Sequence, residues 1–294
     1  MTVPAEAFPH IDDDPPPSDL QRWREDYRRR RARRSTVIAS VSTVVFLAVV
    51  LVAIFLSPGW PRVRQSFFDG AVARDALPDI LRGLWLNVRV LAVTAVLVVV
   101  VGLLVAALRT LRGPIYFPVR ALAAAYTDFF RGMPLIILLY LVGFGLPGLQ
   151  LQGIPNSPVV LGTVALVLTY SAYVSEVFRA GIESVHPSQR AAARSLGLTY
   201  GQTMRRVVLP QAVRRVAPPL LNDFVALQKD VGLISVLGAL DAVRQAQIHS
   251  DETFNFTPYL VAGLLFVLLA FPMIRVADWV SVRAARRQQA SGSL

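Results

Sequence analysis

The 294-residue chain contains no cysteine and only three histidines, His10, His186 and His249. Without cysteine it can form neither a disulfide framework nor a thiolate metal site. The three histidines are far apart in sequence and do not show the short spacing of zinc ligands. The chain also lacks the Gly-x4-Gly-Lys-Ser/Thr loop with which many ATPases hold phosphate. We therefore expect no metal site and no cofactor bound by this chain. A membrane-bound enzyme is the least favoured of the functional hypotheses.

Long apolar runs without charged residues dominate the sequence. Hydrophobic residues make up 54% of the chain, which is high for a soluble protein and ordinary for a protein with several membrane spans. The formal net charge of +11 would also suit a nucleic-acid-binding protein. However, the arginines flank the apolar runs, which is the pattern of the positive-inside rule. The sequence thus predicts an all-α membrane protein that contacts lipid and no nucleic acid.

Six segments are candidate membrane spans. A helix rises about 1.5 Å per residue, so about 20 apolar residues cross the hydrocarbon core of a bilayer. The third candidate is short, and we expect it to be tilted, broken or extended back to Ala121. Ser57-Pro58-Gly59-Trp60 predicts the end of the first span, whose apolar core is longer than that of a signal peptide. The six predicted spans are 37–56, 84–108, 131–146, 159–180, 217–237 and 258–280.

Arginine-rich segments set the predicted orientation. Lys and Arg outside the spans gather before the first span, between the second and third, between the fourth and fifth, and after the sixth. By the positive-inside rule these segments are cytoplasmic, which places both termini in the cytoplasm. Residues 1–36 are predicted to be a disordered basic arm, and residues 281–294 a tail. The arginines of the arm either act only as an orientation signal or form a helix on anionic headgroups.

The cytoplasmic loop at residues 183–215 carries two short predicted helices. Pro187 stops any earlier helix, and Ser188 is a good N-cap for the first one. Gly197 stands where this helix would end in a left-handed turn. A capping box at Thr199–Gln202 predicts the start of the second helix. Two interpretations stay open from physics alone: a mechanical part gripped by the groove of another protein, or an ordinary interfacial helix.

The same loop resembles the EAA loop of bacterial ABC import permeases. Ala192-Ala193, Gly197 and then Val207-Val208-Leu209-Pro210 reproduce the spacing of Glu-Ala-Ala-x3-Gly-x9-Ile-x-Leu-Pro. Ala191 replaces the glutamate of the motif, Val207 replaces its isoleucine, and Pro210 breaks or restarts the helix. The resemblance implies that the loop couples to an ATPase through Gln189, Ala192, Ala193, Arg194, Ser195, Leu196, Gly197, Leu209 and Pro210.

Further motifs resemble the polar amino acid permeases of the histidine, glutamine, glutamate and arginine type. The last of them departs from the family's Lys-Asp-Thr-Ser-Leu at Val231 and Gly232. Together they cover about residues 80–280. The resemblance implies the type I ABC importer transmembrane fold, with five core spans preceded here by an extra span at 37–56. The motifs are Phe130-Arg131-Gly132-Met133-Pro134-Leu135, residues 172–182, residues 194–198, Leu209-Pro210-Gln211-Ala212 and residues 227–233.

The resemblance also implies a function and partners. It implies the permease subunit of an ATP-driven importer of polar amino acids in the bacterial cytoplasmic (inner) membrane, working by alternating access. ATP and Mg²⁺ would bind to separate ABC ATPase subunits. An extracellular or periplasmic amino-acid-binding protein would deliver substrate, and a second permease chain, identical or related, would complete the core. The alternative is a secondary transporter driven by an ion gradient, which would not need the loop and more often shows two similar halves.

Ionisable groups at bilayer depth are functional candidates, because burying them in the membrane costs free energy unless they are paired with an opposite charge or reached by water. Asn222 and Lys229 are seven residues apart and share one helix face, and Asp223 and Asp230 form a neighbouring stripe. A kink is expected at Pro218-Pro219. These four polar residues, with Glu176 and Arg131, are the candidate substrate-pathway residues.

A structural role is the alternative for the same charges. Lys229 and Asp230 would then pair with Glu176 or Arg131 on neighbouring spans. Arg131-Gly132-Met133-Pro134 places a charge before a helix-breaking pair. It either fixes a bend in the third span or anchors Arg131 at the headgroups.

Overall fold

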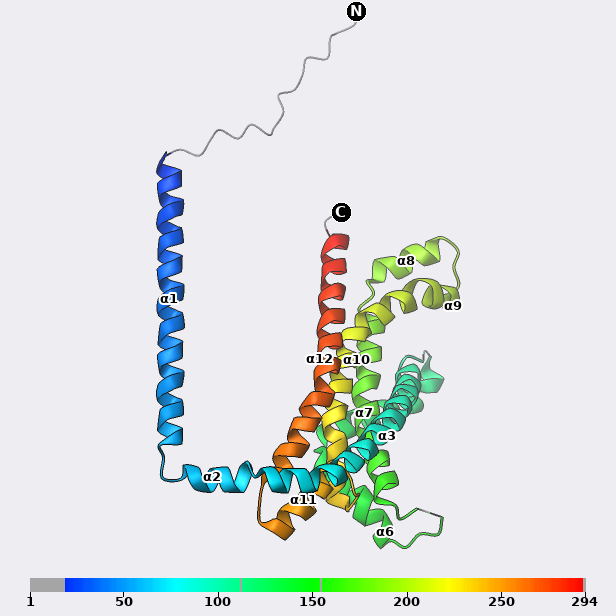
Figure 1. Ribbon diagram of the computed structural model, residues 1–294. Coiled ribbons are helices and arrows are strands. Elements are labelled where there is room, and N and C mark those ends of the chain that lie inside the picture. The colour runs from blue at the N-terminus through cyan, green and yellow to red at the C-terminus, as the bar shows by residue number, and fades with distance from the viewer. Residues whose placement is uncertain (1–18, 112, 154, 293–294) are drawn as a thin grey trace, which may run out of the picture. The chain divides into compact units, whose positions relative to one another are not determined.

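The computed structural model describes residues 19–111, 113–153 and 155–292 of the chain. Within these ranges every regular element is a helix, which confirms the all-α prediction (Figure 1). The chain divides into two compact units, Met1–Val63 and Arg64–Leu294. The part of the predicted arm over residues 1–18 lies outside the described residues.

The first unit consists mainly of α1 (Asp19–Phe55), a single helix of 37 residues. The prediction that the arm is disordered up to residue 36 is wrong from Asp19 onward, because this basic segment continues the helix of the span. The segment Arg33–Phe55 is long and apolar enough to cross a membrane, and none of its side chains is buried. That exposure suits a helix surrounded by lipid. As predicted, the helix ends just before Ser57, and the rings of Phe55 and Trp60 meet edge to face with centroids 4.6 Å apart.

Three further helical runs are long and apolar enough to span a membrane: Trp60–Arg109, Pro158–Glu183 and Thr257–Ala284. They confirm the predicted second, fourth and sixth spans, with longer helices than expected. The elements that form them are α2 (Trp60–Phe67), α3 (Gly70–Arg109), α7 (Pro158–Glu183) and α12 (Thr257–Gly292). Because α12 remains helical to Gly292, the predicted tail at 281–294 is largely an extension of the last helix.

The early start of α3 has a physical cause. Asp79 and Arg82 interrupt the apolar run in the sequence, so the predicted span began only at residue 84. In the structure, Ala76 and Ile80 are fully buried against α11 (Ala242–Thr253) and Ala262 of α12. Tertiary packing therefore stabilises a turn of helix that local hydropathy does not predict.

The predicted third span is a broken one. Residues Pro114–Gly132 and Leu135–Gly148 form two helical segments bent by 105° at the intervening residues. Pro134 has no N–H to continue the helix, which explains the break after Gly132. The motif Arg131-Gly132-Met133-Pro134 thus fixes a bend, as one of the two interpretations held. The elements are η1 (Pro114–Tyr116), α4 (Phe117–Gly132), α5 (Leu135–Tyr140), η2 (Leu141–Gly145) and α6 (Leu146–Gly148).

The predicted fifth span is formed by α10 (Leu209–Asp230) followed by the 3-10 helix η4 (Val231–Leu237). This helix is not among those long and apolar enough to qualify as a span by composition, because arginines, aspartates and one lysine interrupt it. Pro218 and Pro219 lie inside α10, which is helical on both sides of them. The α10 helix packs against α7 and α12. Its polar residues differ in burial: Gln228 is fully buried and Asp223 and Asp230 are partly buried, whereas Asn222 and Lys229 are exposed.

The main core of the second unit lies where α3, α7, α10 and η4 meet. Close approach of α3 and α7 depends on Gly102, where a Cβ atom would lie 2.7 Å from Val174 Cγ1. Small residues allow this kind of close contact between helices in membranes. Members of the core include Val90, Leu91, Val98, Leu166, Val174, Leu227 and Ile234.

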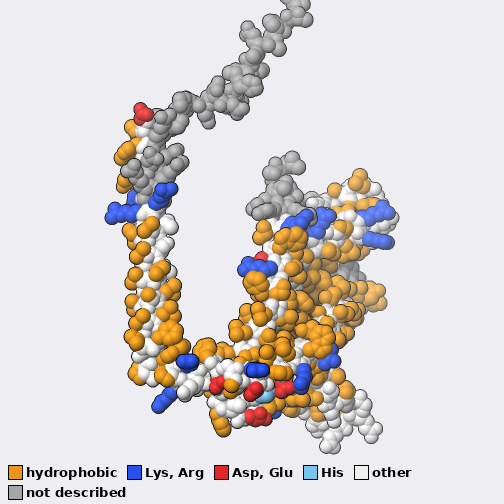
Figure 2. Space-filling model, viewed as in Figure 1, with side chains coloured by type: hydrophobic (Ala, Val, Ile, Leu, Met, Phe, Trp, Pro, Cys, Tyr) orange, Lys and Arg blue, Asp and Glu red, His pale blue; other side chains and the backbone are white. Residues whose placement is uncertain are grey.

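The second unit has two distinct ends (Figure 1). The short helices α8 (Pro187–Ser195) and α9 (Tyr200–Thr203) lie at the same end as the C-terminal turns of α12, whereas α6 and α11 lie at the other end. Between the ends, hydrophobic side chains cover much of the surface (Figure 2). The exposed hydrophobic residues of α12 include Leu264, Val267 and Leu268. An exposed apolar flank between two ends that carry charge is what a lipid-embedded helix bundle requires.

Candidate functional site

The loop helix α8 begins with a cap that differs from the predicted one. The N-cap is His186, whose Nδ1 accepts a hydrogen bond from the Ser188 backbone N–H at 3.2 Å. Pro187 occupies the first helical turn instead of stopping the helix, because that position needs no N–H. Ser188 was therefore the wrong residue for the cap, although the predicted length of about two turns is right.

The end of α8 follows the prediction. Gly197 has a φ of +80°, the left-handed region that favours glycine. The Leu198 N–H donates to the Ala193 carbonyl at 3.2 Å, and the Gly197 N–H donates to the Arg194 carbonyl at 2.9 Å. This is the Schellman pattern of helix termination. It fixes the direction in which the chain leaves α8.

The second helix of the loop starts with the predicted capping box. The Thr199 N–H donates to Gln202 Oε1 at 2.9 Å, and the Gln202 N–H donates to Thr199 Oγ1 at 3.3 Å. Helical structure then continues through the π-helical turn η3 (Met204–Val208) into α10. Pro210 sits in the first turn of α10, which begins at Leu209, so of the two expectations for Pro210 the α-helix restarts there. The wider π turn precedes this proline, and such turns are often found at functional sites.

Most of the predicted coupling residues form an exposed surface at the end of the second unit. Gln189, Ala192, Arg194 and Ser195 are exposed, and Leu196 exposes 81% of its surface. Ala193 is instead buried and fixes α8 against its surroundings. Leu209 and Pro210 do not belong to α8 and lie at the start of α10, after α9 and η3. An exposed leucine on a short, well-capped helix is a feature that a partner's groove could cover.

Two arginines tie this loop to the end of α7. The guanidinium of Arg190 donates to the Ile182 carbonyl, and that of Arg215 donates to the Ser184 carbonyl. Ile182 is in the last turn of α7, and Ser184 is its C-cap. Backbone carbonyls at a helix C-terminus lack intrahelical partners, so arginine donors satisfy them. Movement of α8 or α10 would thus act directly on α7.

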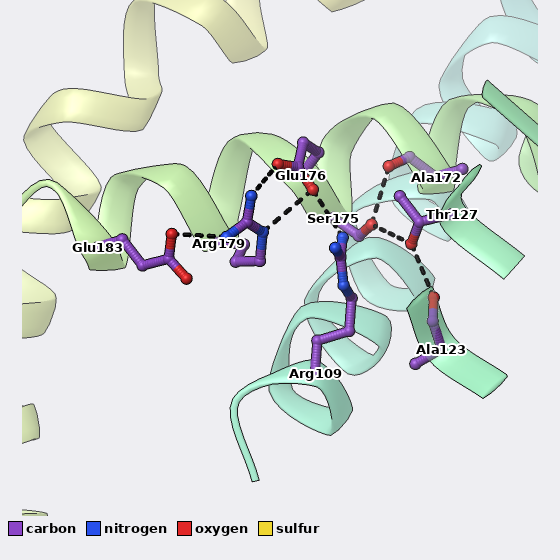
Figure 3. A network of polar contacts seen from close by, with 8 residues as sticks. All are labelled: Arg109, Ala123, Thr127, Ala172, Ser175, Glu176, Arg179 and Glu183. Carbon is purple, nitrogen blue, oxygen red and sulfur yellow. Dashed lines mark hydrogen bonds and ion pairs between the residues drawn. The ribbon is translucent and has the colours of Figure 1, made fainter. Parts of the chain in front are cut away.

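Glu176 joins α3 to α7 in a polar network (Figure 3). Arg109 Nη1 lies 2.6 Å from Glu176 Oε2, and Arg179 also pairs with Glu176. Arg179 Nη1 reaches Glu183 at 2.6 Å, which extends the network toward the loop. The expected structural pairing of Glu176 with Lys229 is wrong. Glu176 binds arginines of α3 and of its own helix instead.

Beside this network, α4 is joined to α7 by hydroxyl groups. Thr127 and Ser175 are both fully buried, and their hydroxyl oxygens lie 3.3 Å apart (Figure 3). Each hydroxyl also donates to a carbonyl of its own helix, Ala123 for Thr127 and Ala172 for Ser175. The end of α7 is therefore held by α3, α4 and the loop together.

A second site is a cavity of about 400 Å³ between the α4–α5 bend, α7 and α10. Three of the predicted pathway residues, Arg131, Asp223 and Asp230, line it. The stripe predicted for Asp223 and Asp230 thus faces this cavity. Asn222 and Lys229 are exposed and do not line it, and neither does Glu176. The remaining lining residues are Gly132, Met133, Pro134, Leu135, Thr169, Tyr170, Tyr173 and Ala226.

Two tyrosines of α7 hold the charged groups of this cavity. The Tyr170 hydroxyl donates to Asp230 Oδ2 at 2.7 Å. The Tyr173 hydroxyl donates to the Arg131 carbonyl at 3.2 Å, and the Arg131 guanidinium carbon lies 5.8 Å from the centre of the Tyr173 ring. In the described part of the chain, none of Arg131, Asp223 and Asp230 forms an ion pair. The cavity therefore presents charges that a ligand could neutralise.

The sequence analysis missed Thr169, Tyr170, Tyr173 and Arg109. A polar cluster at 169–173 inside an otherwise apolar span was a signal for the first three. Arg109 directly follows the predicted second span, 84–108. No sequence signal pairs it with Glu176, because the two residues are 67 positions apart.

Comparison with known proteins identifies the family. Residues 98–286 match the family described as binding-protein-dependent transport system inner membrane component. The arginine transport system permease protein ArtQ of Bacillus subtilis is 34% identical over 202 residues, which covers 68% of this chain and 90% of that protein. The probable glutamine ABC transporter permease protein GlnM of the same organism is 39% identical over 177 residues, covering 59% and 78%.

A solved structure described as an amino acid ABC transporter with histidines agrees with these relatives. It has a TM-score of 0.67 and 31% identity to this chain, and the match covers 73% of this chain and 98% of that one. These relatives confirm the ABC permease prediction over the secondary-transporter alternative. The chain belongs to the binding-protein-dependent transport system inner membrane components, the membrane-embedded permease subunits of ABC importers.

Proposed function

We propose that this permease carries polar amino acids into a bacterial cell through the cavity lined by Arg131, Asp223 and Asp230. The observation that carries the proposal is a set of three charged side chains around one cavity of about 400 Å³, none of which has an ion-pair partner among the described residues. An α-amino acid has both a carboxylate and an ammonium group, so it can pair with charges of both signs. The names of the arginine and glutamine permeases support the same substrate class.

Energy for transport would come from separate ATPase subunits that bind ATP and Mg²⁺. We propose that α8 docks on an ATPase through its exposed side chains, with Leu196 as the apolar contact. Closure of the ATPases would displace α8, and the Arg190 and Arg215 hydrogen bonds would pass that movement to the end of α7. Since α7 also lines the cavity with Tyr170 and Tyr173, the loop and the cavity share one rigid element.

Further partners follow from the family description. A binding protein outside the cytoplasm would deliver the amino acid, and a second permease chain, identical or related, would complete the translocation core. The inner-membrane orientation that we propose has both termini in the cytoplasm. It is supported by the arginine-rich segments and by the position of α8 at the same end of the second unit as the C-terminal turns of α12.

ATP hydrolysis by the assembled transporter tests this proposal. The permease would be co-expressed with its ATPase, purified and placed in lipid nanodiscs, and ATP hydrolysis measured with the Gly197→Val variant beside wild type. Valine is strained at a φ of +80°, so α8 should be misdirected and hydrolysis reduced at least about tenfold. Gly263→Val is the control, because a Cβ atom there meets no atom within 4 Å. Failure of any ATPase to associate, with uptake that follows an ion gradient, would overturn the proposal.

A further inference from the structure

The cavity carries an excess of negative charge. Of its lining residues, Arg131 is cationic, whereas Asp223 and Asp230 are both acidic. Lys229, the neighbour of Asp230 in the sequence, is exposed and is not part of the lining. With both aspartates ionised, the empty cavity therefore has a formal charge of −1.

The three charged side chains differ in the partners that the protein itself provides for them. Asp230 accepts the Tyr170 hydroxyl, and Arg131 lies over the Tyr173 ring. Asp223 has no hydrogen-bond or ion-pair partner among the described residues, and its Oδ2 is buried. An unpaired carboxylate that is partly buried has an unfavourable solvation free energy, so a cationic ligand group near Asp223 would be favoured.

An independent observation points to a ligand at the same place. Thr169 also lines the cavity, is 4% exposed, and its Oγ1 has no hydrogen-bond partner in the described structure. Buried hydroxyl groups are nearly always hydrogen-bonded in folded proteins. The cavity thus offers a free polar group besides its charges, as expected of a binding site that a polar molecule fills.

The charges of the cavity then favour some classes of amino acid over others. One carboxylate of a ligand would pair with Arg131, and its α-ammonium group with one aspartate, which leaves the second aspartate without a counter-charge. A cationic side chain supplies that charge, a neutral amide does not, and an acidic side chain adds repulsion. The volume of about 400 Å³ is within the range of small-molecule sites. The rings of Tyr170 and Tyr173 are also surfaces on which a cation can rest.

We propose that this cavity selects amino acids with a cationic side chain, such as arginine and lysine, and that Asp223 is the residue that determines this preference. The inference rests on the proposed function and makes its substrate class specific. Asp230, already bonded to Tyr170, receives the α-ammonium group. Asp223, which has no hydrogen-bond or ion-pair partner in the described part of the chain, receives the side-chain cation.

The test measures amino acid binding to the permease–ATPase complex in nanodiscs without any binding protein, because a binding protein has its own specificity. L-arginine, L-lysine, L-glutamine and L-glutamate are compared for wild type and Asp223→Asn. We expect arginine and lysine to bind wild type at least about tenfold more tightly than glutamine and glutamate, and Asp223→Asn to abolish this preference while it retains glutamine binding. Asp251→Asn, which removes an exposed carboxylate on α11, is the matched control and should keep the preference.

Each outcome bears on a separate claim. Equal or tighter binding of glutamine or glutamate to wild type would overturn the cationic preference and leave the amino acid permease function in place. A preference that survives in Asp223→Asn would overturn the role of Asp223. If no amino acid binds and none stimulates ATP hydrolysis, the proposed function itself fails. Should Asp223→Asn not fold, the wild-type ranking still decides the substrate class, and Asp223→Ser, which also removes the charge, replaces it in the test of the residue with the same expected loss of preference.

Discussion

Asn87 Nδ2 donates a hydrogen bond to Asp241 Oδ2 at 2.9 Å, although the two residues are 154 positions apart in the sequence. Both side chains are fully buried. Asn87 also donates to the Val231 carbonyl and accepts from the Ala242 N–H, so one amide group joins α3 to η4 and α11. Asp241 in turn is the N-cap of α11 and accepts the Arg244 N–H at 2.9 Å.

This buried carboxyl gives the first prediction, a pH-dependent stability. Burial raises the pKa of Asp241 to about 6, although hydrogen bonds from Asn87 and from backbone amides act in the opposite direction. Since the unfolded chain has the ordinary value near 3.8, the folded state binds the proton more tightly. The resulting stabilisation is fully present below about pH 4 and is lost as the pH rises through about 6. It amounts to roughly 3 kcal/mol, at about 1.4 kcal/mol for each pH unit between the two pKa values.

Thermal unfolding of wild type and Asp241→Asn between pH 4 and pH 7.5 measures this effect. Asparagine does not titrate, so the Tm of the variant should change less over this range than that of wild type. The variant should be less stable overall, because its amide accepts fewer hydrogen bonds. Parallel Tm curves for the two proteins would show that Asp241 is not the titrating group.

Close packing at the same place gives a second prediction. A Cβ atom on Gly83 of α3 would lie 2.5 Å from the Ala242 N, so the backbone before α11 must move in Gly83→Ala. We expect a loss of about 2 kcal/mol or more, since overpacking against backbone cannot be relieved by a rotamer change. Gly263→Ala in α12 is the control: a Cβ atom there meets nothing within 4 Å, and alanine favours the helix. Equal melting temperatures of the two variants would contradict the predicted clash.

Local patterns in the sequence predicted those features whose causes are local. The capping box at Thr199–Gln202 and the left-handed Gly197 depend on neighbouring residues alone, and both are confirmed. The i, i+7 spacing of Asp223 and Asp230 likewise predicted one shared face, and both line the cavity. Helical periodicity is a property of the backbone, so the face that two residues share on a helix does not depend on the tertiary contacts.

What the sequence did not predict depends on contacts between distant segments. The pairing of Arg109 with Glu176 and that of Tyr170 with Asp230 join different helices, and no local pattern encodes either one. The cap of α8 was misassigned for another reason. His186 is an uncommon N-cap, and Pro187 suits the first helical turn as well as a helix stop. The arm was predicted to be disordered because a polar segment cannot bury enough apolar surface to fold alone. However, the helix of the apolar span continues through residues 19–36.

The ion pair between α3 and α7 gives a third prediction. The side chains of Arg109 and Glu176 are only 14% and 22% exposed. Loss of Glu176 leaves Arg109 poorly solvated and without its ion-pair partner, whereas loss of Arg109 leaves Glu176 with Arg179 as its remaining partner. We expect Arg109→Met or Glu176→Gln to destabilise the protein by about 2 kcal/mol, and the double variant to be less destabilised than the sum of the two. A double-mutant cycle on thermal or denaturant unfolding measures this coupling.

A surface ion pair provides the control for that cycle. Arg82 lies 2.9 Å from Asp79, but 78% of the Arg82 side chain is exposed. Arg82→Met should therefore change stability by no more than about 0.5 kcal/mol. Strict additivity at Arg109 and Glu176 would mean that their contact contributes nothing to the packing of α3 against α7.

The fourth prediction concerns the exposed end of α8. Leu196 exposes 81% of its surface, so Leu196→Ala should leave the folded permease as stable as wild type, within about 0.5 kcal/mol. If α8 docks on an ATPase, the same change removes a central apolar contact and should weaken that association roughly tenfold. Thermal unfolding measures the stability of the permease, and titration of the ATPase against the permease in nanodiscs measures their association.

Leu240→Ala is the matched control: this leucine is 57% exposed but immediately precedes Asp241 and α11, at the end of the unit opposite α8. If the two leucine variants bind the ATPase equally well, α8 does not dock through Leu196, and the transmission of movement from α8 to α7 would need a different contact.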